Sequence, residues 1–257
     1  MRILILGGIS DALKLYKMLL AEHTVIYSVK GITPVARLKC ELHIGGFGGV
    51  QGLVNFLIEK QIDCLLDATH PYAVKISEQA KLAANYCSLP CFHYFRPPWQ
   101  QQHNDYWIFF DSMSDLSLHL NQEANRKLRL FFTIGQLPEG FINQKSPQHD
   151  YIVRSVLENK TQGISNIMSK GPFCLEQEKL LFYSYQVDVL VSKNSGGNQV
   201  AAKIQVAREM GLPVYLLKRP QFESNHPIFS TLNAMFHAVS ARSQTRLGTR
   251  VCGIYSA

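Results

Sequence analysis

Residues 63–97 read DCLLDATHPYAVKISEQAKLAANYCSLPCFHYFRP, and they contain one complete unit of an alternating α/β pattern. The apolar run Cys64–Leu66 predicts a buried strand, because it is short and polar residues follow it at once. A helix is expected from about Val74 to Asn85, and a second strand at Cys91–Phe95. Two strands joined through a helix are typical of a parallel sheet.

The same alternation precedes this segment. Strands are predicted at Arg2–Leu6, Val25–Val29 and Leu42–Ile44, with one helix after Ser10 and another near Leu53–Glu59. Strands that alternate with helices predict an α/β fold, in which helices cover both faces of a parallel sheet.

A second copy of the pattern lies in the C-terminal half. Asp188–Val191 repeats Asp63–Leu66, and each is followed by a polar loop and a helix. Leu89-Pro90 and Leu212-Pro213 then each precede a strand that leads, at the same spacing, to an Arg-Pro pair. This internal repeat predicts two Rossmann-like parallel-sheet halves.

A polar stretch after Arg96-Pro97-Pro98-Trp99 interrupts the alternation and marks the predicted domain boundary. We therefore expect a first α/β domain at residues 1–98 and a second α/β domain at residues 106–240. The remaining residues, 241–257, are predicted to form a flexible tail.

Composition limits the class of protein. The chain of 257 residues is 46% hydrophobic and 18% charged, which is the mixture of an ordinary globular protein. Its apolar runs are far too short for a membrane helix, and the first is too short for a secretory signal, so a cytoplasmic protein is expected. The six cysteines show no zinc-site spacing, which predicts reduced structural cysteines and no metal.

The formal net charge of +7 favours an anionic partner. Nucleic acid is disfavoured, because the basic residues are scattered and form no recognisable nucleic-acid motif. A polyanionic small molecule fits the charge as well. The protein is expected to be a monomer or a small homo-oligomer.

Two glycine-rich loops follow predicted strands, which is where parallel sheets bind ligands. Gly7-Gly8-Ile9-Ser10-Asp11-Ala12 is a degenerate dinucleotide fingerprint, and a tight turn is its alternative interpretation. Gly45-Gly46-Phe47-Gly48-Gly49 places four glycines around one aromatic residue, which favours a ligand against the main chain over a flexible linker.

Two polar loops occupy equivalent places in the two halves. Asp67-Ala68-Thr69-His70-Pro71-Tyr72-Ala73 carries a carboxylate, a hydroxyl, an imidazole and a phenol, although helix capping by Asp67 or Thr69 is a simpler alternative. Ser192-Lys193-Asn194-Ser195-Gly196-Gly197, with Lys203 in the helix that follows, is typical of an anion-binding site, and a solvated turn is its alternative.

Together these motifs resemble the precorrin-6A and cobalt-precorrin-6A reductases of cobalamin biosynthesis. The resemblance rests, in this order over about residues 1–220, on Gly7-Gly8, Gly45–Gly49, Asp67–Ala73, Arg96-Pro97, Thr133-Ile134-Gly135, Gly171-Pro172-Phe173, Lys193–Gly197 and Arg219-Pro220. It implies an oxidoreductase that uses NADPH, or NADH, to reduce one double bond of a macrocyclic corrin precursor with many carboxylates. The first domain, residues 1–98, would then bind the dinucleotide and the second domain this macrocycle, with the active-site cleft between the two halves.

The resemblance also implies a role for each candidate residue. The cofactor would contact Gly7, Gly8, Ser10, Ser28, Lys30, Gly46, Phe47, Gly48, Gly49, Asp67, Ala68 and Thr69. The macrocycle would contact Arg96, Asn194, Ser195, Gly196, Gly197, Lys203 and Arg219. Lys30 or Arg37 would hold a 2′-phosphate. The candidates for proton transfer are His70, Tyr72 and Lys193, with solvent or a carboxylic acid of the substrate as alternatives.

Two other functions stay open at this point. A different Rossmann-type enzyme, such as an S-adenosylmethionine-dependent methyltransferase, would also take an anionic substrate. A non-catalytic dinucleotide-binding sensor is the second alternative, although it would have no use for the titratable residues of the polar loops.

Overall fold

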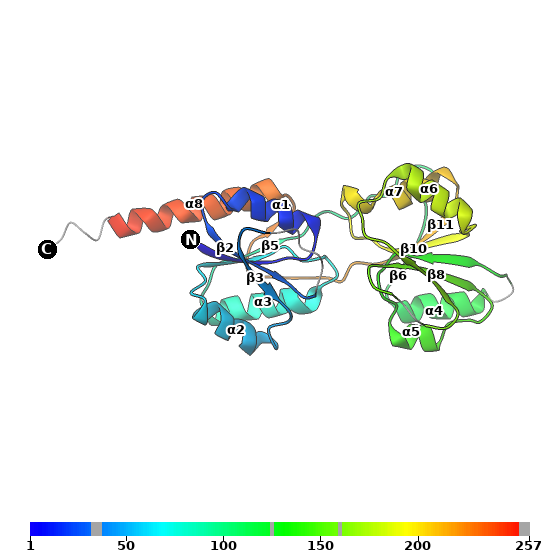
Figure 1. The fold of residues 1–257 in the computed structure, drawn as a ribbon, viewed down its shortest axis with the longest axis horizontal. Coiled ribbons are helices and arrows are strands. Elements are labelled where there is room, and N and C mark those ends of the chain that lie inside the picture. Colours follow the sequence, from blue (N-terminus) through cyan, green and yellow to red (C-terminus); the bar gives the residue numbers. More distant parts are fainter. Residues whose placement is uncertain (32–37, 124–125, 159–160, 252–257) are drawn as a thin grey trace. The chain divides into compact units, whose positions relative to one another are not determined.

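The computed structural model describes residues 1–31, 38–123, 126–158 and 161–251. The chain divides into two compact units, the first made of residues 1–96 with residues from 220 onwards, and the second of residues 97–219 (Figure 1). Within the described residues, each unit contains a six-stranded sheet whose strand pairs are all parallel. The expected α/β fold with two parallel-sheet halves is confirmed.

The first unit has the strand order β12-β5-β4-β1-β2-β3. Its elements are β1 (Arg2–Leu6), α1 (Ser10–Leu19), β2 (Thr24–Val29), β3 (Glu41–Ile44), α2 (Val50–Glu59), β4 (Cys64–Asp67), α3 (Val74–Tyr86), β5 (Cys91–Tyr94), β12 (Ile228–Phe229) and α8 (Leu232–Val251). Helices α1 and α8 contact each other on one face of this sheet, and α2 and α3 contact each other on the other face (Figure 1).

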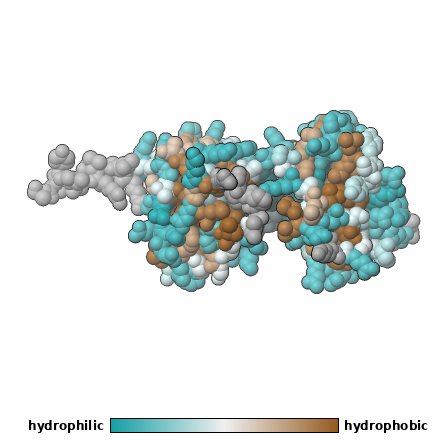
Figure 2. Space-filling view, viewed as in Figure 1, coloured by the Kyte–Doolittle hydropathy of each residue, from teal (hydrophilic) through white to brown (hydrophobic). Residues whose placement is uncertain are grey.

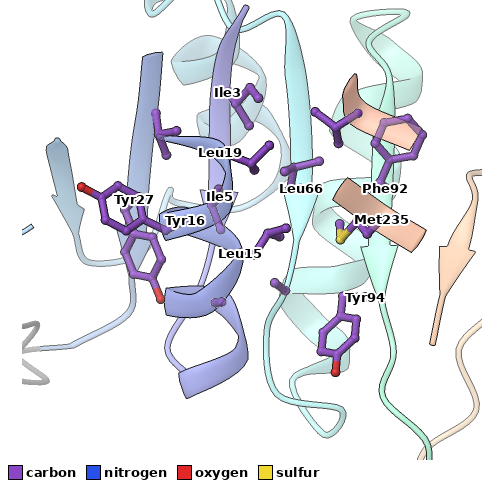
Figure 3. Close-up of a cluster of buried hydrophobic side chains, with 14 of the residues drawn as sticks. Ile3, Ile5, Leu15, Tyr16, Leu19, Tyr27, Leu66, Phe92, Tyr94 and Met235 are labelled. Atoms are coloured by element: carbon purple, nitrogen blue, oxygen red, sulfur yellow. The ribbon is translucent and has the colours of Figure 1, made fainter. Parts of the chain in front are cut away.

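Successive residues of the central strands supply the two cores of the first unit. Ile5 of β1 and Leu66 of β4 pack against Leu15 of α1, and Met235 of α8 belongs to the same cluster (Figure 3). Leu4, the neighbour of Ile5, lies in the second core with residues of α2 and α3. Burial on both faces explains why these strands were recognisable as continuous apolar runs rather than as alternating ones.

The second unit has the strand order β6-β11-β10-β7-β8-β9. Its elements are β6 (Tyr106–Phe110), α4 (Met113–Gln122), β7 (Arg129–Phe132), α5 (Glu139–Asn143), β8 (Asp150–Ser155), β9 (Ile164–Met168), α6 (Leu175–Ser184), β10 (Val189–Lys193), a short 3-10 helix (Asn198–Val200), α7 (Ala202–Glu209) and β11 (Pro213–Leu217). None of the helices in the described ranges is long and apolar enough to cross a membrane. Figure 2 shows hydrophilic residues over much of the visible surface, with hydrophobic residues in smaller groups.

The two units follow the same plan. Strand β4 lies between β1 and β5, just as β10 lies between β7 and β11. The backbone N–H of Arg2 donates to Asp63 Oδ2 at 2.8 Å, and that of Arg129 donates to Asp188 Oδ2 at 2.8 Å. The repeat recognised in the sequence therefore extends over the whole sheet of each unit.

In each sheet, one edge strand comes from the segment that follows the other repeat in the sequence. The chain leaves the first unit after Arg96 and forms β6, which pairs with β11. It leaves the second unit after Arg219 and forms β12, which pairs with β5. The two repeats thus exchange their edge strands reciprocally, and helices α4 and α8 follow the exchanged strands.

This exchange corrects two predicted boundaries. Residues 220–240 belong to the first unit and not to the second domain expected at 106–240. Residues 241–251, expected in a flexible tail, continue helix α8, and residues 252–257 lie outside the described residues. The physical reason is packing: Met235 of α8 is fully buried in the core of the first unit, a long-range contact that local sequence patterns do not encode.

Candidate functional site

A cavity of about 830 Å³ opens at the C-terminal ends of β1, β2, β3 and β4 in the first unit. We call it the first-unit pocket. Its lining consists of Leu6, Gly7, Gly8, Ile9, Ser28, Lys30, Gly45, Gly46, Phe47, Gly48, Gly49, Thr69, His70, Tyr72, Ala73, Lys75, Ile76 and Gln79. The volume lies within the range of about 300–1,000 Å³ that is usual for pockets of small molecules and cofactors.

The loop after β1 requires glycine at its first position. A Cβ atom on Gly7 would lie 2.3 Å from the hydroxyl oxygen of Tyr27, which is buried beneath the loop. The same hydroxyl accepts a hydrogen bond from the N–H of Gly8 at 3.4 Å, and Gly8 itself has φ +111°. The glycines therefore let the main chain lie flat over Tyr27 and present a side-chain-free surface to the pocket.

The loop after β3 is folded around Phe47. The rings of Phe47 and His43 are stacked with centroids 4.4 Å apart, and Phe56 meets Phe47 edge to face at 5.1 Å. A Cβ atom on Gly52 would lie 1.6 Å from the carbonyl oxygen of Phe47, so that position accepts no other residue. These contacts favour a shaped wall of the pocket over the flexible linker that was its alternative.

The loop after β4 brings His70 and Tyr72 to the pocket. Their ring centroids are 5.7 Å apart, and the N–H of Tyr72 donates to His70 Nδ1 at 3.3 Å. His70 Nδ1 is therefore an acceptor, which leaves Nε2 to carry the proton of the neutral ring. Helix capping does not explain this loop, because α3 begins after Ala73 without a side-chain cap.

Most of the predicted cofactor residues line the pocket, but three do not. Ser10 is the first residue of α1, whereas Asp67 and Ala68 are 4% and 0% exposed and lie beneath the pocket. Arg37, the second candidate for a 2′-phosphate, lies outside the described residues.

Sequence reasoning missed the face that α3 turns to the pocket. Lys75 and Ile76 lie there, and Gln79 lies one helical turn further along. The signal was present, because a helix that starts directly after a strand-end loop presents its first turns to the ligand side of the sheet. Lys75 and Lys30 give the lining two cationic side chains.

Both predicted lysines of the second unit, Lys193 and Lys203, are partly or fully shielded from solvent. Lys203 is 4% exposed, and its ammonium donates to Thr133 Oγ1 at 2.8 Å and lies 5.6 Å from the ring centre of Trp99. Burial, reinforced by the positive charge of Arg154, lowers the pKa of Lys203 to about 7. Lys193 is half-buried, which lowers its pKa too, and it donates to the carbonyl oxygen of Ile134 at 3.2 Å.

The loop that follows β10 is held by the segment before β6. Asn194 Oδ1 accepts from the backbone N–H of Trp99 at 2.9 Å, and the indole N–H of Trp99 donates to the carbonyl oxygen of Gly197 at 3.1 Å. A Cβ atom on Gly196 would lie 2.0 Å from the carbonyl oxygen of Pro97. The Asn194 side chain and the conformation of Gly196 thus have structural functions within the second unit.

The two arginines of the Arg-Pro pairs are each anchored inside their own unit. Arg96 is 9% exposed and pairs with Asp11 Oδ2 of α1 at 3.0 Å. Arg219 Nε donates to the carbonyl oxygen of Asn194 at 2.6 Å. Neighbouring charges in the second unit include a buried pair that the sequence did not reveal, Arg154 with Glu178.

Comparison with known proteins identifies relatives over nearly the whole chain. The family model "Precorrin-6x reductase CbiJ/CobK" matches residues 2–240. A precorrin-6A reductase of Sinorhizobium sp is 36% identical over 226 residues, which cover 85% of each chain. That of Rhodobacter capsulatus is 34% identical over 229 residues, which cover 85% of this chain and 88% of the relative.

A cobalt-precorrin-6A reductase of Priestia megaterium is 28% identical over 264 residues, which cover 95% of this chain and 99% of the relative. Among solved structures, CobK precorrin-6A reductase matches with a TM-score of 0.84 at 31% identity, covering 93% of this chain and 96% of that chain. The matched region includes the loops of the first-unit pocket and the polar loop after β10.

Proposed function

Since the chain belongs to the precorrin-6x reductase CbiJ/CobK family, we propose that it is a precorrin-6A reductase of cobalamin biosynthesis that takes its hydride from NADPH. The reaction adds a hydride to one carbon of the macrocycle and a proton to a neighbouring carbon. The observation that carries the cofactor assignment is the first-unit pocket, where glycine loops, two lysines and an aromatic wall converge on strand ends.

The residues of the first-unit pocket fit a nicotinamide dinucleotide. The Cβ position of Gly8 has no neighbour within 4 Å, so this loop exposes its main chain at the pocket without a side chain, as close approach of a pyrophosphate requires. Lys30 and Lys75 supply charge for a 2′-phosphate, and Phe47 supplies an apolar wall. The bound cofactor would supply the hydride, while the protein binds and orients it.

Metal-free precorrin-6A is the preferred substrate in this proposal. Relatives named precorrin-6A reductase are 31–36% identical to this chain, and those named cobalt-precorrin-6A reductase are 24–28% identical. The substrate's carboxylates would bind cations, for which Lys193, Lys203, Arg96 and Arg219 are the candidates. The predicted cleft between the halves stays a prediction, as does a cytoplasmic location.

The candidates for the proton donor are ionisable side chains near the C-terminal ends of the strands. His70 and Tyr72 line the first-unit pocket, and the neutral His70 ring carries its proton on Nε2. Lys193 is the third candidate, since burial lowers its pKa toward the range in which a lysine can give up a proton. Solvent and a carboxylic acid of the substrate remain the alternatives.

The test is a reductase assay with purified protein, both macrocycles and both dinucleotides, and a parallel reaction that contains S-adenosylmethionine. We expect NADPH oxidation only when precorrin-6A is present, with one NADPH consumed per macrocycle reduced. Consumption of S-adenosylmethionine instead would favour the methyltransferase. Tight NADPH binding without oxidation in the presence of either macrocycle would favour the sensor.

A further inference from the structure

A buried carboxylate and a buried imidazole face each other beneath the first-unit pocket. Asp67 and His93 stand opposite each other in the register of β4 and β5. Asp67 Oδ2 lies 3.0 Å from His93 Nδ1, and the two residues are 4% and 1% exposed. An ionised carboxylate only accepts hydrogen bonds, so Nδ1 is the donor.

The other oxygen of Asp67 holds the start of the pocket loop. Asp67 Oδ1 accepts from the backbone N–H of Thr69 at 3.1 Å and from its hydroxyl at 2.7 Å. Burial alone would raise the pKa of Asp67, but hydrogen bonds and charge from His93, with Ser77 and Thr69, outweigh it and hold the pKa below its ordinary value. Asp67 is therefore a charged anchor for Thr69, which itself lines the pocket.

The internal repeat provides a control that the molecule itself contains. In the second unit the register of β10 and β11 places Ser192 opposite Leu216, at the positions equivalent to Asp67 and His93. Both are fully buried, and the same parallel sheet forms around them. The sheet therefore does not require a carboxylate–imidazole pair at this place.

A buried pair is costly to keep, because both groups lose their hydration and replacement by well-packed neutral residues is often neutral or stabilising. The Asp67–His93 pair occurs in the unit with the glycine-lined pocket and is replaced by Ser192 and Leu216 in the other unit. This difference indicates that the pair serves the pocket loop. His93 is also fixed from its other side, since the ring of Phe222 packs edge to face on it with centroids 4.8 Å apart. Phe222 belongs to the segment that returns from the second unit, and Lys81 of α3 donates to its neighbour Glu223.

We propose that His93 is a positioning residue of the first-unit pocket: it orients Asp67, and Asp67 in turn fixes Thr69 and the loop that carries His70 and Tyr72. His93 does not touch the ligand. The inference rests on the proposed function only in naming NADPH as the ligand of the pocket, while the positioning itself is a property of the free protein.

The test uses the full-length chain with three variants: His93→Leu, His93→Asn and the double variant Asp67→Ser/His93→Leu. Asparagine places a side-chain nitrogen close to the position of Nδ1, whereas the double variant copies the neutral pair of the second unit. Two measurements are made, namely amide hydrogen exchange at Thr69 without ligand and the Kd for NADPH by titration calorimetry.

We expect His93→Leu and the double variant to remain folded, to exchange the Thr69 amide faster and to bind NADPH about tenfold more weakly, since Asp67 loses a charged hydrogen bond or its carboxylate. His93→Asn should restore both properties. Unchanged exchange in the folded leucine variants, or an asparagine variant that behaves like leucine, would overturn the proposal. Failure of the double variant to fold would also overturn it, because the pair would then serve the sheet. If the wild type does not bind NADPH, the proposed function fails, while the exchange result still decides the role of His93.

Discussion

Gly8 shows how a single backbone angle links the fold to the pocket. Its φ of +111° disfavours any L side chain, and its Cβ position has no neighbour within 4 Å, so a substituent would project into open space at the pocket. Gly8→Val should therefore weaken NADPH binding by about tenfold, since contacts to the main chain worth about 0.5–1.5 kcal/mol each are lost. Titration calorimetry measures this. Gly211→Val, at an exposed glycine with φ +64° and equally open surroundings, is the matched control. An unchanged Kd in a folded Gly8→Val protein would remove this loop from the cofactor site.

The buried Lys203 leads to a second prediction at the residue scale, on how stability depends on pH. Its pKa is lowered from 10.5 to about 7 by burial, so the unfolded chain binds more protons than the folded one between these two values. The stability of the second unit should therefore rise with pH across that window and should be lowest below it. Lys203→Met should stabilise the protein near neutral pH and flatten the dependence, as urea unfolding at several pH values would show. Lys127→Met, an exposed lysine paired with Asp150, is the control that should leave the slope as it is. Equal slopes in wild type and Lys203→Met would contradict the assignment.

Helix α3 leads to a prediction at the scale of an element, because its first turn adds Lys75 to the pocket lining, which also includes Lys30. If the two ammonium groups hold a 2′-phosphate, Lys30→Ala/Lys75→Ala should lower kcat/KM for NADPH by about tenfold and leave NADH nearly unaffected, since only NADPH carries that charge. Steady-state kinetics with both cofactors measures the ratio, and Lys127→Ala should not change it. A ratio equal to that of the wild type would place the 2′-phosphate elsewhere.

Elements also show how far sequence reasoning reached. The central strands were predictable because they are buried on both faces, with Ile5 and Leu66 in one core and Leu4 in the other, which leaves a continuous apolar run. The pocket loops were predictable because glycines at positive φ and polar clusters stand out against such runs. Strand β12 was not predicted, because its two residues form a strand only by pairing with β5. In the sequence, the whole second unit lies between these two strands. The role of His93 was not predicted for a similar reason. Its partner Asp67 lies on the neighbouring strand, and no local sequence pattern marks the two residues as a pair.

At the scale of the whole molecule, the net charge of +7 should act on an anionic substrate before contact. Lys193 stands at the end of β10, and Lys193→Ala should raise KM for the macrocycle and weaken the dependence of KM on salt, with cofactor affinity nearly unchanged. The reason is screening, which at 0.1 M salt removes interactions between exposed charges beyond about 10 Å. Kinetics at two salt concentrations decide the matter. A fall in kcat without a change in KM would instead indicate that Lys193 transfers the proton.

The reciprocal exchange of β6 and β12 has a consequence for the newborn chain. The first 96 residues emerge early from the ribosome. The unit to which they belong nevertheless lacks strand β12 and the helix carrying Met235 until the segment after residue 219 has been translated. The segment 97–219, by contrast, is contiguous and holds every strand of its own sheet. Since domains usually mature in the order in which they emerge, at about 5–20 residues per second, this protein inverts the rule. The half made first is completed last, and a chain truncated after residue 219 would hold all six strands of the second sheet but would lack β12 and α8 of the first unit.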